Sequence, residues 1–247
     1  MTSFLQTNLI EIRERMALAC QRAGRQPEDV TLLPVSKTFA PSIIRDAAAL
    51  GLKRFGENRV QEIRDKSPEL ADLDLQWVLI GHLQTNKAKD AARLVGEVQS
   101  LDRDSLAQEL DRRLQALGRG IDVLVQVKTS TEPSKFGLAP EDLLTFLNSL
   151  RGYASLRPCG LMTLAENTED EARVRACFRL LRALRDQALE AGHDSVTRLS
   201  MGMSGDFEWA IEEGSTEVRM GSLLFGRRPA PAGQGSGVVA QQAGDMK

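Results

Sequence analysis

The sequence predicts an α/β protein: a single (β/α)8 TIM-type barrel preceded by one extra helix. The chain has 247 residues, a length typical of such barrels. Short apolar runs alternate with amphipathic segments, which indicates parallel strands joined by helical crossovers. Eight such strand–helix pairs can be counted, and this number favours a closed barrel over an open sheet. The motif GxGxxG is absent, which counts further against an open dinucleotide-binding sheet.

The barrel is expected to begin after a leading helix. Apolar positions at helical spacing mark this helix at residues 4–23, and it ends near Gly24. The first strand, 30–36, is mostly apolar, as is typical of parallel strands buried on both faces. The other predicted strands are short runs rich in apolar residues: 53–56, 76–81, 98–101, 121–127, 157–163, 197–201 and 217–220.

Each predicted strand is followed by a segment with helical periodicity. Gly51 and Gly118 close two of these helices, and Thr85 is expected to cap the helix after the third strand. The predicted helices are 41–50, a segment through Val60 and Ile63, 85–95, 103–117, 140–150, 169–191, 206–213 and the short segment 223–225. We therefore assign residues 1–228 to the barrel. Residues 229–247 are small and polar, and we expect them to form a disordered tail.

Composition excludes several classes of function. The net charge is −2 and the basic residues are spread along helices, so no nucleic-acid surface is indicated. Three cysteines without CxxC spacing and two histidines favour neither a metal site nor a disulfide framework. A cytoplasmic location is then the default. No signal peptide and no membrane span of about 20 apolar residues is seen, and a monomer is expected.

Polar residues follow the predicted strands directly. The carboxyl ends of parallel barrel strands open on one rim, so these residues are expected to face one another. Lys37 follows the first strand and Asn58 the second, while two Gly/Ser loops, 200–206 and 219–222, follow strands seven and eight. Backbone N–H groups of such loops bind phosphate, commonly in this position of a barrel. Taken alone, Lys37 could also mark the point where its strand reaches water.

Several motifs resemble those of the pyridoxal phosphate homeostasis proteins (the YggS/PROSC family). They follow the family order over roughly residues 4–227: Val35-Ser-Lys37-Thr, Gly56-Glu-Asn58 with Val60-Gln-Glu62, Ile80-Gly-His-Leu-Gln-Thr-Asn-Lys87, Ser134-Lys-Phe-Gly137, Gly160-Leu-Met162, Leu199-Ser-Met-Gly-Met-Ser204 and Val218-Arg-Met-Gly-Ser222. The resemblance implies a barrel like the N-terminal domain of alanine racemase. It also implies pyridoxal phosphate (PLP), a form of vitamin B6, held as a Schiff base on Lys37. The chain departs from the family pattern at Arg59, Lys128 and Ser222.

The resemblance implies a set of cofactor-binding residues: Lys37, Asn58, Ser200, Met201, Ser204, Arg219, Gly221 and Ser222. Covalent attachment needs a neutral amine, which burial at the barrel mouth and a nearby cation such as Arg219 favour. Asn58 would bond the phenolic oxygen of PLP. Arg219 would contact the ring nitrogen and keep it unprotonated, which weakens the ring as an electron sink. Alternatively, Arg219 forms a salt bridge with Glu217 or Glu57.

Three functions fit these residues. The favoured one is a PLP carrier or regulator without catalytic turnover, whose recipients would be apo-enzymes that use PLP. The first alternative is a PLP-dependent amino-acid racemase, which would need a second base from another domain or subunit that this chain is expected to lack. An aldolase-type barrel explains Lys37 and the phosphate loops but not the motif set. His82 and Glu57 are expected to be supporting residues, and Lys135 a surface lysine or a second amine used during release.

Overall fold

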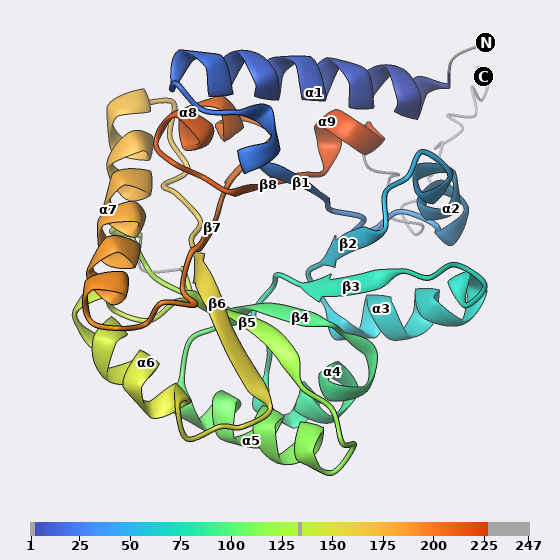
Figure 1. Ribbon diagram of the computed structural model, residues 1–247. Helices are drawn as coiled ribbons and strands as arrows, with labels where there is room; N and C mark the ends of the chain where they lie inside the picture. Colours follow the sequence, from blue (N-terminus) through green and yellow to red (C-terminus); the bar gives the residue numbers. More distant parts are fainter. Residues whose placement is uncertain (1–2, 133–134, 227–247) are drawn as a thin grey trace, which may run out of the picture.

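The computed structural model confirms the predicted (β/α)8 barrel (Figure 1). It describes residues 3–132 and 135–226. The predicted tail at 229–247 and the motif residue Ser134 therefore lie outside the described residues.

Eight parallel strands form one sheet in the order β1-β8-β7-β6-β5-β4-β3-β2. The strands are β1 Thr31–Pro34, β2 Arg54–Glu57, β3 Gln76–Leu79, β4 Glu97–Leu101, β5 Ile121–Gln126, β6 Leu156–Met162, β7 Arg198–Met203 and β8 Glu217–Met220. The first strand is shorter than predicted because the chain changes partner at its end. Val35 N–H still donates to Met220 of β8, whereas Ser36 N–H donates to the Gly56 carbonyl of β2 at 3.0 Å. This switch brings the ends of β1 and β2 together and nearly closes the barrel.

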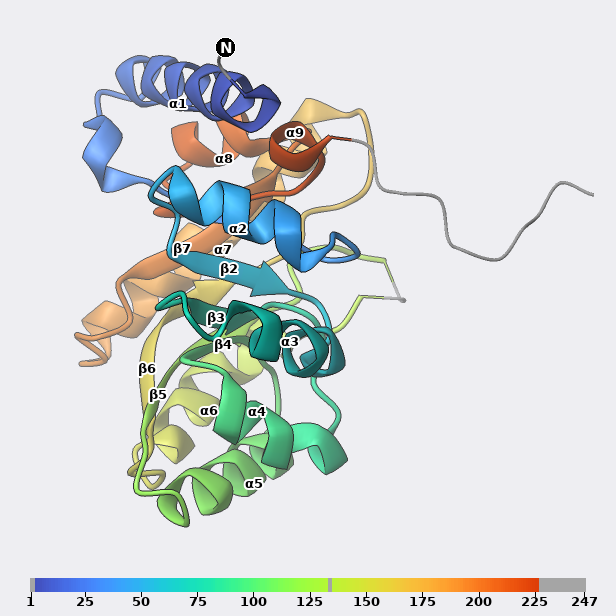
Figure 2. The same ribbon diagram turned by 90° about the vertical axis from the view of Figure 1, so that its right-hand side faces the viewer.

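Helices cover the outside of the sheet (Figure 2). The α-helices are α1 Phe4–Arg22, α2 Pro41–Ala49, α3 Val60–Lys66, α4 Ala88–Leu94, α5 Asp104–Gln115, α6 Leu143–Leu150, α7 Glu171–Glu190, α8 Phe207–Glu212 and α9 Ser222–Phe225. The predicted helices at 85–95 and 140–150 each begin with a 3-10 turn, η3 Thr85–Lys87 and η4 Pro140–Asp142. Two further 3-10 turns are η1 Pro27–Asp29 and η2 Ser67–Leu70. The predicted cap was wrong: Thr85 lies inside η3, and its hydroxyl accepts a hydrogen bond from Arg103 at 3.2 Å.

The extra N-terminal helix is also confirmed. In Figure 1, α1 lies across α8 and α9. Its buried stripe, which includes Leu9 and Ile12, continues the hydrophobic core. Polar contacts fix its position, because Asn8 donates to the Leu224 carbonyl at 2.9 Å and Arg15 pairs with Glu208 at 3.0 Å. No helix in the described part of the chain is long and apolar enough to cross a membrane.

The barrel interior carries charged residues that the apolar strand pattern did not indicate. Arg54, Glu97, Arg198 and Glu217 are the first residues of four strands, and each arginine pairs with both carboxylates at 2.8–3.1 Å. Burial alone would raise the pKa of Glu217, but the charges of Arg54 and Arg198 outweigh it and lower that pKa. Since side chains alternate along a strand, the same face continues two residues later with Gln99, Ser200 and Arg219. This second layer leads to the barrel mouth.

Candidate functional site

Lys37 lies in the loop after β1, and the residues on both sides of it are held by carboxylates. Ser36 Oγ donates to Glu57 Oε1 at 2.7 Å. Thr38 N–H donates to Glu62 Oε2 at 2.7 Å. Thr38 has a φ of 69°, a left-handed conformation that is costly for a β-branched residue and persists only where the surroundings enforce it. The position of Lys37 is therefore set by its neighbours.

A buried lysine joins the two carboxylates. Lys66 Nζ donates to Glu57 Oε1 at 2.7 Å, to Glu62 Oε2 at 2.9 Å and to the Ser36 carbonyl at 3.0 Å. Burial raises the pKa of the Glu57 carboxyl, against the opposing effects of Lys66 and Ser36. We call Glu57, Glu62 and Lys66 the Lys37 clamp. Within the clamp, Glu57 acts as a hydrogen-bond acceptor.

Replacing Lys66 with methionine is expected to destabilise the protein by about 3 kcal/mol, because removing one partner of a buried ion pair leaves the other charge uncompensated. The side chain of Lys66 is only 9% exposed, so solvent cannot replace it. Urea unfolding measures the change, with Lys53→Met, at an exposed position, as the control. A loss no larger than that of the control would mean that the clamp does not stabilise the loop.

Arg219 is a buried cation with neutral hydrogen-bond partners. Its Nη1 donates to Ser200 Oγ and its Nη2 to the Thr163 carbonyl, both at 2.8 Å. Within residues 3–132 and 135–226, no carboxylate lies within 4.0 Å of the guanidinium, so the alternative salt bridge with Glu217 or Glu57 is not formed. Burial lowers the pKa of Arg219 to about 10, which leaves the group cationic at neutral pH.

Ser200 and Met201 lie deeper than a rim position. The Ser200 hydroxyl accepts from Arg219 and donates to Gln99 Oε1 at 2.7 Å, so it fixes the arginine from below. The Met201 side chain is fully buried in the apolar core, which leaves only its backbone to face a ligand. Neither Gln99 nor Thr163 was singled out from the sequence as a neighbour of Arg219.

The loops after β7 and β8 lie side by side at the mouth. Leu223 N–H approaches Ser204 Oγ at 3.5 Å, which joins the two loops. The N–H groups of Ser204, Gly205, Gly221 and Ser222 have no hydrogen-bond acceptor among the described residues. Four N–H groups on adjacent loops suit an anion such as phosphate.

The glycines of these loops are not required by the packing of the protein itself. A Cβ on Gly205 would meet no atom of the described part of the chain within 4 Å. A Cβ on Gly221 would be in ordinary contact with Val35, whose carbonyl oxygen would lie 3.6 Å away. Small residues that leave open space above free N–H groups allow close approach of a ligand.

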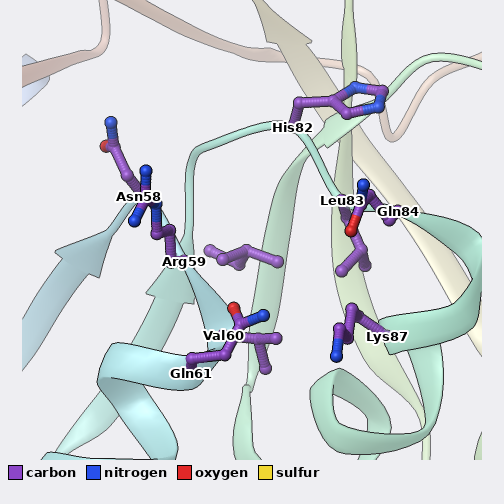
Figure 3. Close-up of a pocket in the computed structure, with 9 residues that line it drawn as sticks. Asn58, Arg59, Val60, Gln61, His82, Leu83, Gln84 and Lys87 are labelled. Atoms are coloured by element: carbon purple, nitrogen blue, oxygen red, sulfur yellow. The ribbon is translucent and has the colours of Figure 1, made fainter.

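Asn58 directly follows β2, the strand whose end lies next to the end of β1. Its backbone packs so tightly against the β3 loop that a Cβ on Gly81 would overlap the Asn58 carbonyl oxygen. Asn58 also lines a pocket of about 270 Å³ between these two loops (Figure 3). The sheet thus places Lys37, Asn58 and Arg219 at the ends of three adjacent strands.

The remaining candidates have structural contacts. The His82 ring stacks on Phe136 with ring centroids 3.9 Å apart. Lys135 is not an exposed amine, because it pairs with Glu132 at 2.6 Å and donates to the Ala165 carbonyl. Across the described ranges, no group of three or more His, Cys, Asp or Glu residues is arranged to hold a metal ion.

Together these features define a class of protein: a (β/α)8 barrel with a lysine after β1, a buried arginine on β8 and two glycine-containing loops. The family model described as alanine racemase, N-terminal domain, matches residues 7–229.

Similarity to complete relatives identifies the family within this class. The pyridoxal phosphate homeostasis protein of Aquifex aeolicus is 44% identical over 220 residues, which cover 89% of this chain and 96% of the relative. That of Pseudomonas aeruginosa is 44% identical over 232 residues, 93% of this chain and 99% of the relative. The structure of PipY from Synechococcus elongatus with PLP bound is 40% identical, with a TM-score of 0.76 over 87% of this chain and 100% of PipY. The chain belongs to the pyridoxal phosphate homeostasis protein family, as its motifs predicted.

Proposed function

We propose that this protein binds PLP at the barrel mouth and acts in PLP homeostasis as a carrier or regulator, without catalytic turnover. The buried Arg219 cation carries this proposal. A buried charge with only neutral partners gains from an electron-rich ligand atom, and the pyridine nitrogen of PLP is such an atom. Relatives of matching length are named for PLP homeostasis, and the PipY structure contains PLP.

The residues at the mouth fit the reactive part of PLP. When bound, PLP supplies an aldehyde that condenses with a primary amine, and Lys37 is the amine at the end of β1. Arg219, one strand away, would donate to the ring nitrogen and keep it unprotonated. Asn58, on the other side of Lys37, would donate to the phenolic oxygen. Ser200 holds Arg219 in place through its hydroxyl.

The phosphate group fits the loops after β7 and β8. The N–H groups of Ser204, Gly205, Gly221 and Ser222 lie on these two loops without acceptors among the described residues. The hydroxyls of Ser204 and Ser222 add two more donors. This set, the phosphate cradle, binds the dianion through charge-assisted hydrogen bonds. The side chain of Met201, three residues before Ser204, is buried in the core.

Replacing Gly221 with valine is expected to weaken PLP binding at least about tenfold, because a branched side chain blocks hydrogen bonds to a charged group. Binding of pyridoxal, which has no phosphate, should change little. Titration with both ligands measures the difference, and Gly152→Val, at a turn after α6, is the matched control. Equal losses for PLP and pyridoxal would place the phosphate elsewhere.

As a carrier, the protein would act as a cytoplasmic monomer that passes PLP to apo-enzymes. Mixing PLP-loaded protein with an apo-aminotransferase tests this role. Recovery of aminotransferase activity, with loss of the bound-cofactor absorbance, supports transfer. Retention of all PLP by the protein over hours, while free PLP activates the same enzyme, would contradict the carrier role.

A further inference from the structure

The pocket that Asn58 lines, between the loops after β2 and β3, lies beside the proposed cofactor site (Figure 3). One wall is the loop after β2 and the start of α3, with Arg59 and Gln61. The other wall is the loop after β3 and η3, with Gln84 and Lys87. The volume is about 270 Å³, enough for a small metabolite. We call it the rim pocket; of the residues assigned above to PLP, only Asn58 lines it.

The rim pocket is positively charged. Among the described residues, its lining contains no carboxylate. In the described ranges, neither Arg59 nor Lys87 has a carboxylate within 4.0 Å, whereas surface arginines such as Arg45 and Arg112 are paired. The charge of Arg59 helps to lower the pKa of Glu62, but the Glu62 carboxylate already accepts hydrogen bonds from Thr38 and Lys66. A concave site that carries cations and no carboxylate concentrates anions.

The remaining lining suits the rest of a small organic anion. In Figure 3 the Gln61 amide and the Lys87 ammonium lie on opposite walls of the pocket. Buried Leu79 and Val60 provide an apolar surface between the walls. Cations bind the oxygens of carboxylate or phosphate groups, amides orient them, and the apolar surface accepts a few carbon atoms.

We propose that the rim pocket binds a small anionic metabolite, bearing carboxylate or phosphate groups, between Arg59 and Lys87. Such a ligand would hold the β2 and β3 loops together. Asn58 lies at the junction of these loops, so occupancy of the pocket would change PLP affinity, and PLP would change the affinity of the pocket by the same factor. This coupling rests on the proposed function, whereas binding of the anion does not.

Calorimetric titration of PLP-loaded protein in chloride buffer tests the proposal, with inorganic phosphate and glutarate as separate probes. Because bound PLP already occupies the phosphate cradle, saturable 1:1 binding of either probe would take place in the rim pocket. Lys87→Gln is expected to weaken binding about tenfold, the loss typical of one charge-assisted hydrogen bond. Lys89→Gln makes the same charge change at an exposed site outside the lining and should leave the Kd unchanged. A preference for glutarate or for phosphate identifies the anionic group.

Equal losses for Lys87→Gln and Lys89→Gln, or no saturable binding of either probe up to about 10 mM, would overturn the proposal. The absorbance of bound PLP is recorded first for each variant, so failure of the cofactor site is seen separately. If the protein takes up no PLP, the titration is repeated on Gly221→Val, whose cradle is blocked. Saturable binding that Lys87→Gln abolishes would then still assign the rim pocket.

Discussion

Lys37→Ala protein is expected to lose the visible absorbance of covalently bound PLP completely. Its affinity for PLP should also fall on the order of a hundredfold. The covalent bond to Lys37 is lost, whereas the hydrogen bonds of the phosphate cradle remain. The structure gives the reason: the clamp fixes Ser36 and Thr38, so the lysine between them is held at the end of β1. Absorption titration with PLP measures both effects.

The matched control is Lys135→Ala. Lys135 follows β5 and is engaged with Glu132 and the Ala165 carbonyl, so its removal should leave the absorbance band intact. Circular dichroism and urea unfolding show whether each variant is folded. If folded Lys37→Ala protein kept the absorbance band, or if Lys135→Ala protein lost it, PLP would not be attached at the end of β1.

PLP-loaded protein is expected to turn over amino acids at less than about 0.1 s⁻¹, which is a typical enzymatic rate reduced by the factor of 10²–10⁴ that a positioned base contributes. Arg219 remains cationic at neutral pH, and in the proposed site it would keep the ring nitrogen unprotonated, so the ring would delocalise a carbanion poorly. The sequence contains one tyrosine, Tyr153, and its hydroxyl donates to Asp104 at the start of α5 at 2.9 Å, so it is already engaged. Glu57 is bonded within the clamp.

Incubation with alanine and with serine in deuterated water measures this directly, through the enantiomer ratio and α-hydrogen exchange. Free PLP at the same concentration is the control, because it catalyses both reactions slowly without protein. Sustained racemisation at about 1 s⁻¹ or faster would contradict the carrier proposal and favour the racemase alternative.

The fold was predictable because each strand and helix carries its own periodicity. The eight strands and the leading helix all occur where apolar spacing placed them, with ends shifted by a few residues. The shortened β1 could not be predicted, because its end depends on a change of partner from Met220 to Gly56. The cap assigned to Thr85 failed because Arg103, distant in sequence, takes up its hydroxyl.

The site was less predictable because its supports come from different strands and helices. Strand alternation could have placed Ser200 inside the barrel, since it lies two residues after inward-facing Arg198. Lys66 carried one local signal, its i,i+4 spacing from Glu62. Its contact with the Ser36 carbonyl exists only after α3 packs on the end of β1. Phosphate binding by Ser204, Gly221 and Ser222 remains a prediction.

The central claim, that Lys37 holds PLP, is tested most directly by borohydride reduction followed by peptide mapping. Reduction makes the link between cofactor and amine permanent, and mass spectrometry then locates it. We predict one pyridoxyl group per chain, on the peptide that contains Lys37. Modification confined to another lysine, such as Lys135, or no modification of protein saturated with PLP, would contradict the claim.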